Sequence, residues 1–227
     1  MDQSQLLAQV SIFQGLPRET LADLAKRVWH KQAEAGSVIV SQEDAGDALF
    51  VIAKGKVKVV LYGETGREII LSMLKAGDFF GEMSLLDSQP RSANVVAVED
   101  SELLCLDREG FQTHLLANPS TALNVLAEMS RRLRHADEVI GNLALLDVYA
   151  RVAGILRDLA QKQGEPVDGG LLIKERPTQQ EIAGLIGTSR ETVSRALNDF
   201  TRQGLLEMQG KQILVRWTFL RKSEDAA

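Results

Sequence analysis

Between Gly36 and Leu106 the chain alternates short apolar runs with Gly-containing turns. The β-branched or alternating runs predict strands over residues 37–40, 48–52, 57–61, 68–71, 93–97 and 102–106. Six short strands at roughly ten-residue spacing are typical of an antiparallel roll or barrel, so this region is predicted to form a β-roll of the jelly-roll type. Ahead of it, Leu21, Leu24 and Val28 are spaced as on one face of a helix.

After Arg108 the apolar period becomes helical. Pro119-Ser120 is typical of a helix start, and no further Gly or Pro occurs before Gly141. Apolar residues then recur in steps of four and three, as on the seam of a two-stranded coiled coil: Ala122, Leu126, Met129, Leu133, Ala136, Ile140 and Leu143. Leu123 and Val125 widen this stripe, which leaves a helix packed on its own domain as the alternative. The spacing favours a dimerisation helix.

The remainder of the chain predicts helices and one hairpin. Asp147 is placed to cap a further helix, and a polar, Gly-rich loop follows over residues 161–170. The last 50 or so residues predict a helix, a turn, a second helix and a β-hairpin formed by residues 204–208 and 213–215. The chain as a whole is therefore predicted to be an α+β protein.

Composition narrows the class of protein. The net charge is −5, but residues 1–146 carry 14 Lys and Arg against 20 Asp and Glu, and residues 147–227 carry 12 against 11. Any binding of nucleic acid by the second part must therefore be local and specific rather than a bulk effect of charge. A single cysteine, Cys105, excludes an internal disulfide and a cysteine-ligated zinc or iron–sulfur site within one chain. No apolar run approaches the roughly 18 residues of a membrane span, and no leader pattern opens the chain, so we expect a cytoplasmic protein that does not contact a membrane.

The second part contains a helix-turn-helix pattern. Thr178–Glu181 and Thr188–Glu191 are both capping boxes of the Thr-x-x-Glu type, ten residues apart, and each can open a helix. Between them Ala183 is small where two helices must cross closely, and Gly187 permits a tight turn. This spacing predicts a helix-turn-helix whose second helix starts near Ser189.

The first turns of that second helix have the chemistry of a DNA reader. Arginines there can fork onto guanine, and a glutamate can accept from the cytosine amino group, whereas hydroxyl groups and the helix start suit phosphate contacts. The alternative is a solvated charged face held by a Glu191–Arg195 pair. The predicted DNA-binding residues are Thr178, Ser189, Arg190, Glu191, Thr192, Ser194 and Arg195.

The first part contains a second candidate site over residues 77–92. Gly81 precedes a short predicted helix, Glu82 lies in its first turn, and Arg91-Ser92 follows ten residues later. Backbone amides and Arg91 can hold phosphate oxygens, and Glu82 can accept from a sugar hydroxyl, which makes a cradle for a phosphorylated sugar. A purely structural Arg91–Glu82 ion pair remains the alternative at this point.

The order of roll, heptad helix and helix-turn-helix resembles the CRP/FNR superfamily of bacterial transcription regulators, and within it the branch that binds cyclic AMP. The segments that carry this resemblance are residues 81–92 (GE…RS), 141–148 (GNLALLDV) and 189–193 (SRETV). The resemblance extends from about Phe13 to Val215 and implies a homodimer that binds double-stranded DNA and RNA polymerase. It also implies three parts: a cyclic-nucleotide-binding roll over residues 1–117, a dimerisation helix and hinge over 118–146, and a winged helix-turn-helix over 147–227.

The same resemblance implies a residue-level site. Glu82 would bind the ribose 2′-hydroxyl, Arg91 and Ser92 the cyclic phosphate, and Arg132 would reach in from the dimer helix. Arg190, Glu191 and Arg195 match the base-reading trio, which implies an inverted repeat of TGTGA-like half-sites. The implied nucleotide-binding set is Leu71, Ser72, Phe80, Gly81, Glu82, Met83, Arg91, Ser92, Arg132, Ala136 and Asp137.

The chain departs from that family pattern where the nucleobase should bind. Cyclic-AMP-binding members carry Thr-Ser at two positions of the dimer helix that here are Ala136 and Asp137. Alanine offers no hydrogen bond, and a carboxylate can accept from the amino group of adenine or from guanine. Cyclic AMP is the expected effector, with cyclic GMP, cyclic di-GMP or action without a ligand as alternatives.

Two other sensing chemistries and one rival class of protein are disfavoured. The N-terminal cysteine cluster of iron–sulfur sensors is missing, and the three histidines, His30, His114 and His135, show no ligand spacing for haem, so no metal is expected. An enzyme on a cupin-like roll would need metal-ligating histidines inside the barrel, but residues 36–106 contain no histidine. We therefore expect a regulator and not an enzyme.

Overall fold

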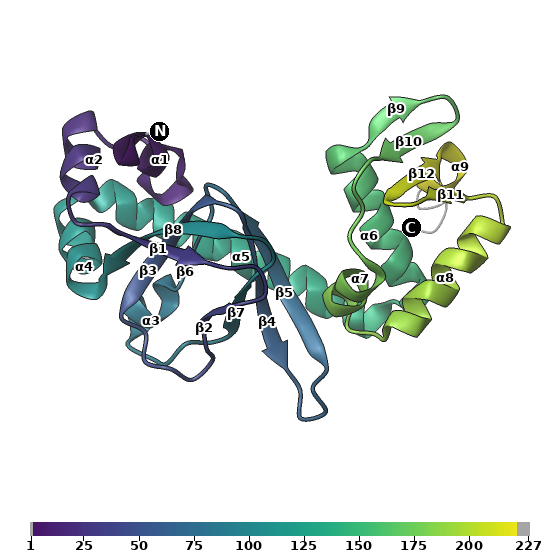
Figure 1. Cartoon of the computed structure of the whole chain (residues 1–227), viewed down its shortest axis with the longest axis horizontal. Helices are drawn as coiled ribbons and strands as arrows, with labels where there is room; N and C mark the ends of the chain where they lie inside the picture. The colour runs from purple at the N-terminus through teal and green to yellow at the C-terminus, as the bar shows by residue number, and fades with distance from the viewer. Residues whose placement is uncertain (1, 222–227) are drawn as a thin grey trace. The chain divides into compact units, whose positions relative to one another are not determined.

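The computed structural model describes residues 2–221 and divides into two compact units, with the boundary between Ala136 and Asp137 (Figure 1). Most of the first unit is a β-roll made of two four-stranded antiparallel sheets. One sheet has the order β1 (Trp29–Ala33), β8 (Ser101–Asp107), β3 (Ala48–Lys54) and β6 (Phe79–Phe80). The other has the order β2 (Val38–Val40), β7 (Asn94–Ala97), β4 (Lys56–Tyr62) and β5 (Glu68–Lys75).

Each apolar run of the roll lies on one of these strands, so the roll predicted from the pattern is confirmed. The apolar runs predict the strands correctly because alternate side chains of β3, β7 and β8 fill the space between the sheets. In that space the rings of Phe50 and Phe80 stack with their centres 5.0 Å apart. Strand β1 was not predicted, because four of its five side chains are exposed and the sequence Trp-His-Lys-Gln-Ala shows no apolar alternation.

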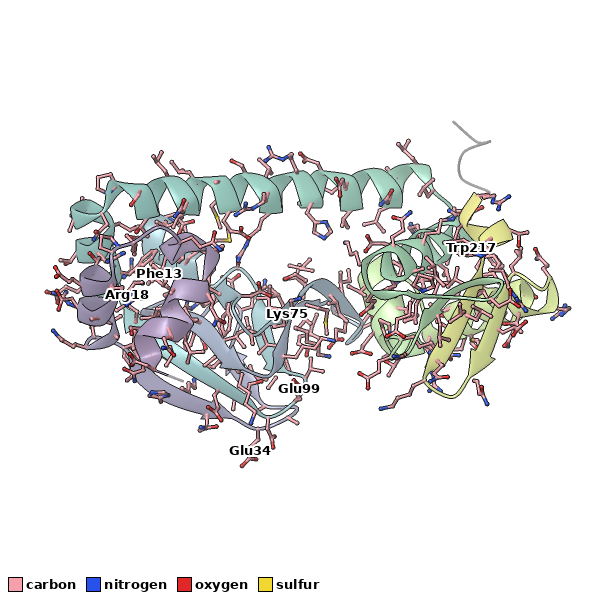
Figure 2. All side chains as sticks on the ribbon, turned by 90° about the horizontal axis from the view of Figure 1, so that it is seen from above. Phe13, Arg18, Glu34, Lys75, Glu99 and Trp217 are labelled. Atoms are coloured by element: carbon pink, nitrogen blue, oxygen red, sulfur yellow. The ribbon has the colours of Figure 1, made fainter. Side chains whose placement is uncertain are left out.

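Helices cover one side of the roll. The segments α1 (Gln3–Gln9), the 3₁₀ turn Ser11–Phe13 and α2 (Arg18–Ala25) pack with α4 (Arg108–Ala117) and the first part of α5 (Pro119–Leu145) around a second apolar cluster. Phe13 and Phe111 are at its centre. Figure 2 labels Phe13 and Arg18 in this N-terminal region; Arg18, the first residue of α2, is exposed. The short helix α3 (Glu82–Asp87) follows β6 directly.

Helix α5 has two different faces along the roll. Thr121 and Val125 are buried against the unit's own core, and the side-chain amide of Asn124 donates to the carbonyls of Ile12 and Gln14. The other face is apolar but exposed: Leu126 is 63% exposed and Leu133 64%. Side chains project from both faces in Figure 2. One face of α5 therefore packs on its own unit, and the apolar stripe lies on a different, exposed face.

The second unit is built on α6 (Val148–Gln163), α7 (Gln179–Ile186) and α8 (Arg190–Arg202). A four-stranded antiparallel sheet of order β11, β12, β10, β9 and the short helix α9 (Trp217–Arg221) complete it; the strands span Leu206–Gln209, Gln212–Arg216, Gly170–Ile173 and Glu165–Val167. The apolar faces of these elements meet in one core that includes Leu156, Ile182, Val193, Leu197 and Ile213. This is the helix-turn-helix with a β-hairpin that the sequence predicted.

One prediction for this unit is wrong in part. Residues 161–170 were expected to form a loop, but Gln161–Gln163 end α6 and Glu165–Val167 form β9. Strand β9 lies at the edge of the sheet and pairs only with β10, and all three of its side chains are exposed. An exposed strand at a sheet edge does not need a buried apolar face, so the pattern of apolar and polar residues did not predict β9. Within residues 2–221, no helix combines the length and the apolar character that a bilayer crossing requires.

Candidate functional site

Arg91 is a buried cation in the first unit. It is only 5% exposed, and its two terminal nitrogens donate to the carbonyls of Gly81 (2.7 Å) and Ala48 (2.8 Å). Its ionic partner Asp47 is 3.8 Å away and almost fully exposed. Burial lowers the pKa of Arg91, and the charge of Asp47 opposes this shift. A guanidinium held mainly by neutral carbonyls in a desolvated position favours a bound anion.

Gly81 is required by the position of Arg91. Its φ of +85° lies in the left-handed region, and a Cβ at this residue would be 2.5 Å from Nη1 of Arg91 and 3.0 Å from the carbonyl oxygen of Ala48. Any side chain would therefore displace the guanidinium. Gly81 is therefore needed for close packing against Arg91 as well as for the turn.

Glu82 is the next residue and is 1% exposed. Its Oε1 accepts from Nη1 of Arg132 at 3.0 Å, whereas its Oε2 is buried and has no hydrogen-bond partner among the residues that the structure describes. Desolvation raises the pKa of Glu82 even though the charge of Arg132 lowers it. A buried acceptor without a donor is costly, and a hydroxyl group of a ligand would satisfy it. The carboxylate therefore fits a sugar hydroxyl.

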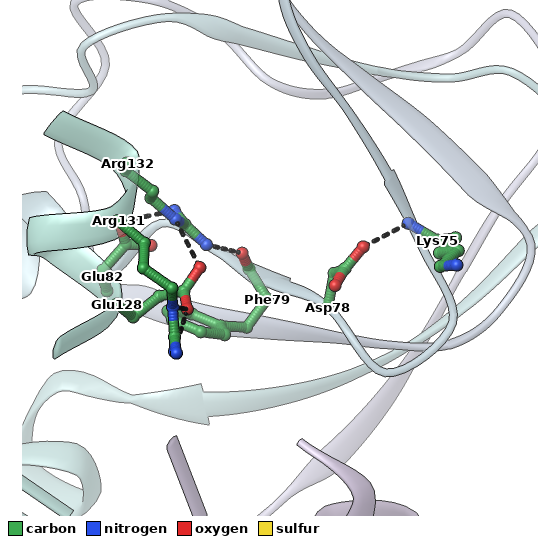
Figure 3. Close-up of polar contacts among 7 residues, drawn as sticks. All are labelled: Lys75, Asp78, Phe79, Glu82, Glu128, Arg131 and Arg132. Atoms are coloured by element: carbon green, nitrogen blue, oxygen red, sulfur yellow. Dashed lines mark hydrogen bonds and ion pairs between the residues drawn. The ribbon is translucent and has the colours of Figure 1, made fainter. Parts of the chain in front are cut away.

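Arg132 connects this carboxylate to α5 (Figure 3). Besides Glu82 it donates to the carbonyl of Phe79 at 2.9 Å, and its guanidinium lies 4.6 Å from the centre of the Phe79 ring. Its Nε is 3.4 Å from Glu128, which also binds Arg131 at 2.6 Å. The ion pair of Glu82 is thus made with Arg132, from 50 residues away, and not with Arg91 as in the structural alternative.

The remaining predicted nucleotide-binding residues differ in their surroundings. Ser92 and Met83 are exposed, and the Ser92 hydroxyl donates to the Met83 sulfur at 3.7 Å. Phe80 is buried against Phe50, whose ring lies 5.6 Å from the Arg91 guanidinium. On β5, Leu71 is exposed at an irregularity of the ladder and Ser72 is half-buried; on α5, Ala136 is exposed, and Asp137 is the first residue of the second unit. The structure thus brings together Phe80, Gly81, Glu82, Arg91 and Arg132.

The helix-turn-helix has the predicted first cap. Thr178 Oγ1 accepts from the amide of Glu181 at 3.1 Å, and the Glu181 carboxylate accepts from the amide of Thr178 at 2.7 Å. The second predicted box is wrong by one residue. The amide of Thr188 donates to the carbonyl of Ala183, so Thr188 belongs to the turn, and Ser189 caps α8 by accepting from Thr192 at 3.2 Å.

The outward face of α8 carries the predicted base-reading side chains. Arg190, Glu191 and Arg195 are exposed, whereas Thr192 and Ser194 are half-buried. The opposite face is buried in the core of the unit. The pKa of Glu191 is lowered chiefly by a backbone amide and the Ser189 hydroxyl, so this carboxylate stays ionised as an acceptor. Thr178 is exposed at the start of α7.

Several contributors to the cradle have no sequence signal. The carbonyl of Ala48 and the carboxylate of Asp47 were read only as part of a strand and a turn. Neither Glu128 nor Arg108 was singled out from the sequence. Their positions follow from the closure of the roll, which no local pattern reports.

A roll with a buried cation and an orphaned carboxylate oxygen, followed by a capped helix-turn-helix, defines a ligand-responsive DNA-binding regulator. A family model described as a cyclic nucleotide-binding domain matches residues 30–118, and one described as a Crp-like helix-turn-helix domain matches residues 150–222. The chain belongs to the CRP family of cyclic-nucleotide-responsive transcription regulators.

Named relatives differ in their effectors. The chain is 34% identical over 211 residues to the CRP-like cAMP-activated global transcriptional regulator of Mycobacterium tuberculosis, covering 93% of this chain and 94% of the relative. It is 40% identical over 206 residues to the cyclic AMP receptor protein of Thermus thermophilus, covering 90% and 92%. The solved structure of the c-di-GMP-responsive global regulator CLP of Xanthomonas campestris is similar with a TM-score of 0.77 at 25% identity, covering 88% and 99%.

Proposed function

We propose that the protein is a homodimeric regulator that binds cyclic AMP and, in that state, a TGTGA-like inverted repeat in double-stranded DNA. In this proposal residues 1–117 bind the effector, residues 118–146 dimerise and form the hinge, and residues 147–227 read the DNA. One observation carries it: the buried Oε2 of Glu82, which has no hydrogen-bond partner within residues 2–221, lies one residue from the Gly81 carbonyl that accepts from the buried guanidinium of Arg91.

The effector site rests on complementary chemistry. Arg91 and Ser92 would bind a cyclic phosphate, and Glu82 would accept from a ribose hydroxyl, because the first two supply donors and the third an acceptor. When bound, the nucleotide supplies the negative charge and the hydroxyl that these groups lack. Leu71, Ser72, Phe80 and Met83 are the lining residues carried over from the family.

The nucleobase is the least constrained part of the proposal. The relatives named for cyclic AMP support that effector, at 34% and 40% identity. Alanine at 136 and aspartate at 137 favour a second candidate, because a carboxylate accepts from guanine N1–H and N2–H₂, and the structurally similar Xanthomonas campestris regulator is described as c-di-GMP-responsive. Cyclic GMP and cyclic di-GMP are therefore part of the test.

Dimerisation is proposed through the exposed apolar face of α5. Leu126, Leu133 and Ile140 follow the heptad spacing, and each is more than 60% exposed in the single chain. A contiguous apolar seam of this kind is stabilised when a second copy covers it. The exposed residues of α8 in the two copies would then lie about 34 Å apart, in successive major grooves.

The effector would act by preferring one of two states. Arg132 bonds to Glu82 and to the Phe79 carbonyl, so it links the effector site to the helix that forms the seam. Our proposal is that binding completes the packing of α5 and reorients the DNA-reading part about the hinge at residues 142–147. RNA polymerase is the proposed further partner.

The decisive experiment follows DNA binding while nucleotide is added. The purified protein is titrated with cyclic AMP, cyclic GMP and cyclic di-GMP in the presence of a labelled TGTGA palindrome and of a scrambled duplex. We expect cyclic AMP to tighten binding to the palindrome only. Binding to neither duplex under any condition would refute the proposal, and tightening by cyclic di-GMP alone would replace the effector.

Two variants locate the function. Arg91→Ala should abolish the nucleotide dependence and leave the chain folded, because the phosphate loses its buried cation; unchanged nucleotide affinity by calorimetry would contradict this. Glu191→Ala should relax the preference at one base position of each half-site by about 1–3 kcal/mol. The matched control is Glu175→Ala, an exposed carboxylate ahead of α7, which should leave oligonucleotide selection unchanged.

A further inference from the structure

Arg108, the first residue of α4, holds three separate segments of the roll together. Its Nη2 donates to the carbonyl of Gly46 at 2.6 Å and to that of Ser84 at 3.0 Å, and its Nη1 donates to the carbonyl of Leu85 at 3.3 Å. Its own amide donates to the carbonyl of Asp47 at 2.9 Å. One side chain and its backbone thus join the start of α4 to the loop before β3 and to α3.

Those same segments form the walls around Arg91. A Cβ at Gly46 would lie 2.2 Å from the Cβ of Ser84 and 3.1 Å from Nε of Arg91, so the Gly46 backbone is tightly enclosed between these two side chains. Ala48, two residues further on, supplies a carbonyl to Arg91. A shift of the Gly46–Asp47 loop, which leads into β3 at Ala48, or of α3 would therefore move the Arg91 guanidinium.

Arg108 also places a second positive charge near the first. The charge of Arg108 contributes to the lowered pKa of Arg91, after burial, the largest cause. Within the described residues the Arg108 side chain donates only to neutral oxygens, so no carboxylate contact neutralises it. The two like charges repel each other, and an anion beside Arg91 offsets that repulsion.

We propose that Arg108 is a positioning residue for the effector phosphate: it fixes the Gly46–Asp47 loop and α3 around Arg91, and its charge adds to the attraction for the anion. This inference rests on the proposed function, because it assigns a residue to the same effector site.

Three variants of the full chain separate this proposal from a structural contribution alone. Arg108→Gln removes the charge and the fork, Arg108→Lys keeps the charge but loses the fork, and Arg18→Gln removes a charge from the exposed start of α2 as the control. For each, cyclic AMP affinity is measured by calorimetry at several salt concentrations, and thermal unfolding is recorded with and without the nucleotide.

We expect Arg108→Gln to weaken cyclic AMP binding about 10- to 30-fold and Arg108→Lys about threefold, with the control unchanged. The salt dependence of the affinity should become shallower in Arg108→Gln but not in Arg108→Lys, a readout that packing alone does not move. The rise in Tm produced by the nucleotide should shrink together with the affinity.

Lowered ligand-free stability with unchanged affinity and salt dependence would overturn the inference and leave the proposed function intact. If Arg108→Gln does not fold, an unaltered cyclic AMP affinity of Arg108→Lys also overturns the inference, because the forked hydrogen bonds of Arg108 then have no effect on nucleotide binding. Failure of the unaltered protein to bind any of the three cyclic nucleotides would refute the proposed function and the inference together.

Discussion

Replacing Gly81 by alanine tests whether the cradle is as tightly built as the distances indicate. The new methyl group would meet Nη1 of Arg91 at 2.5 Å and the carbonyl oxygen of Ala48 at 3.0 Å, at a φ of +85°. Gly15 is a matched control, because its φ is +81° but a Cβ there would have no neighbour within 4 Å. Both substitutions carry the backbone cost, and only one displaces the guanidinium.

The expected magnitudes follow from these contacts. A left-handed alanine costs about 1–2 kcal/mol at either position. At Gly81 the displaced Arg91 also loses two hydrogen bonds from a charged donor to carbonyls, which are worth about 1.5–3 kcal/mol each before solvent replaces part of them. We therefore expect Gly81→Ala to lower the free energy of unfolding by about 2–3 kcal/mol more than Gly15→Ala does.

Tryptophan fluorescence can follow the first unit alone. The chain has two tryptophans, Trp29 in the roll and Trp217 in the second unit, so a Trp217→Phe background leaves Trp29 as the reporter during urea unfolding. The same proteins are titrated with cyclic AMP, and only Gly81→Ala should lose affinity. Equal destabilisation of the two variants, with equal nucleotide affinity, would refute the close approach of Gly81 to Arg91.

Three further predictions concern separate parts of the molecule. Burial raises the pKa of Glu82, so between the ordinary and the raised pKa the folded unit binds more protons than the unfolded chain. The stability of the unit should therefore fall as the pH rises through this window. The midpoints of urea unfolding should show this fall in the unaltered protein and not in Glu82→Gln. Leu133→Asp should weaken dimerisation by about 3–6 kcal/mol over the two copies, as measured by analytical ultracentrifugation. The control Ala127→Asp changes an exposed residue outside the apolar stripe and should leave dimerisation unchanged. If both variants dimerise with equal strength, the apolar stripe is not the dimer interface. Ser189→Ala should destabilise the second unit by about 1 kcal/mol in thermal unfolding, and Thr188→Ala should destabilise it much less. A larger effect of Thr188→Ala would instead identify Thr188 as the cap of α8.

The sequence predicted those parts of the fold in which local pattern and tertiary environment agree. The runs of β3 and β8 are apolar because both sheets bury them, and the Thr178–Glu181 box is a local motif that closes on itself. Strands β1 and β9 were missed because both lie at a sheet edge with mostly exposed side chains, so neither shows an alternation of apolar and polar residues. The predicted Thr188–Glu191 box does not form because the amide of Thr188 donates to the carbonyl of Ala183 and is not free to donate to Glu191; Ser189 caps α8 instead.

The candidate site was predictable in its residue types but not in its pairings. Glycine, glutamate and arginine at 81, 82 and 91 indicate a phosphate and sugar cradle by chemistry alone. The partner of Glu82 lies 50 residues further along the chain, and that of Arg91 at Ala48 lies 43 residues before it. Such pairings depend on how the roll closes, and a backbone carbonyl leaves no trace in the sequence.

Arg132 and Leu133 are consecutive on α5, and consecutive residues on a helix point about 100° apart. The first contacts the carboxylate of Glu82, and the second belongs to the exposed apolar stripe. A small rotation of α5 about its own axis therefore changes the surroundings of both residues at once. Mutations in α5 should accordingly change the affinity for the effector and the strength of the proposed dimer together, so that evolutionary selection on one property also alters the other.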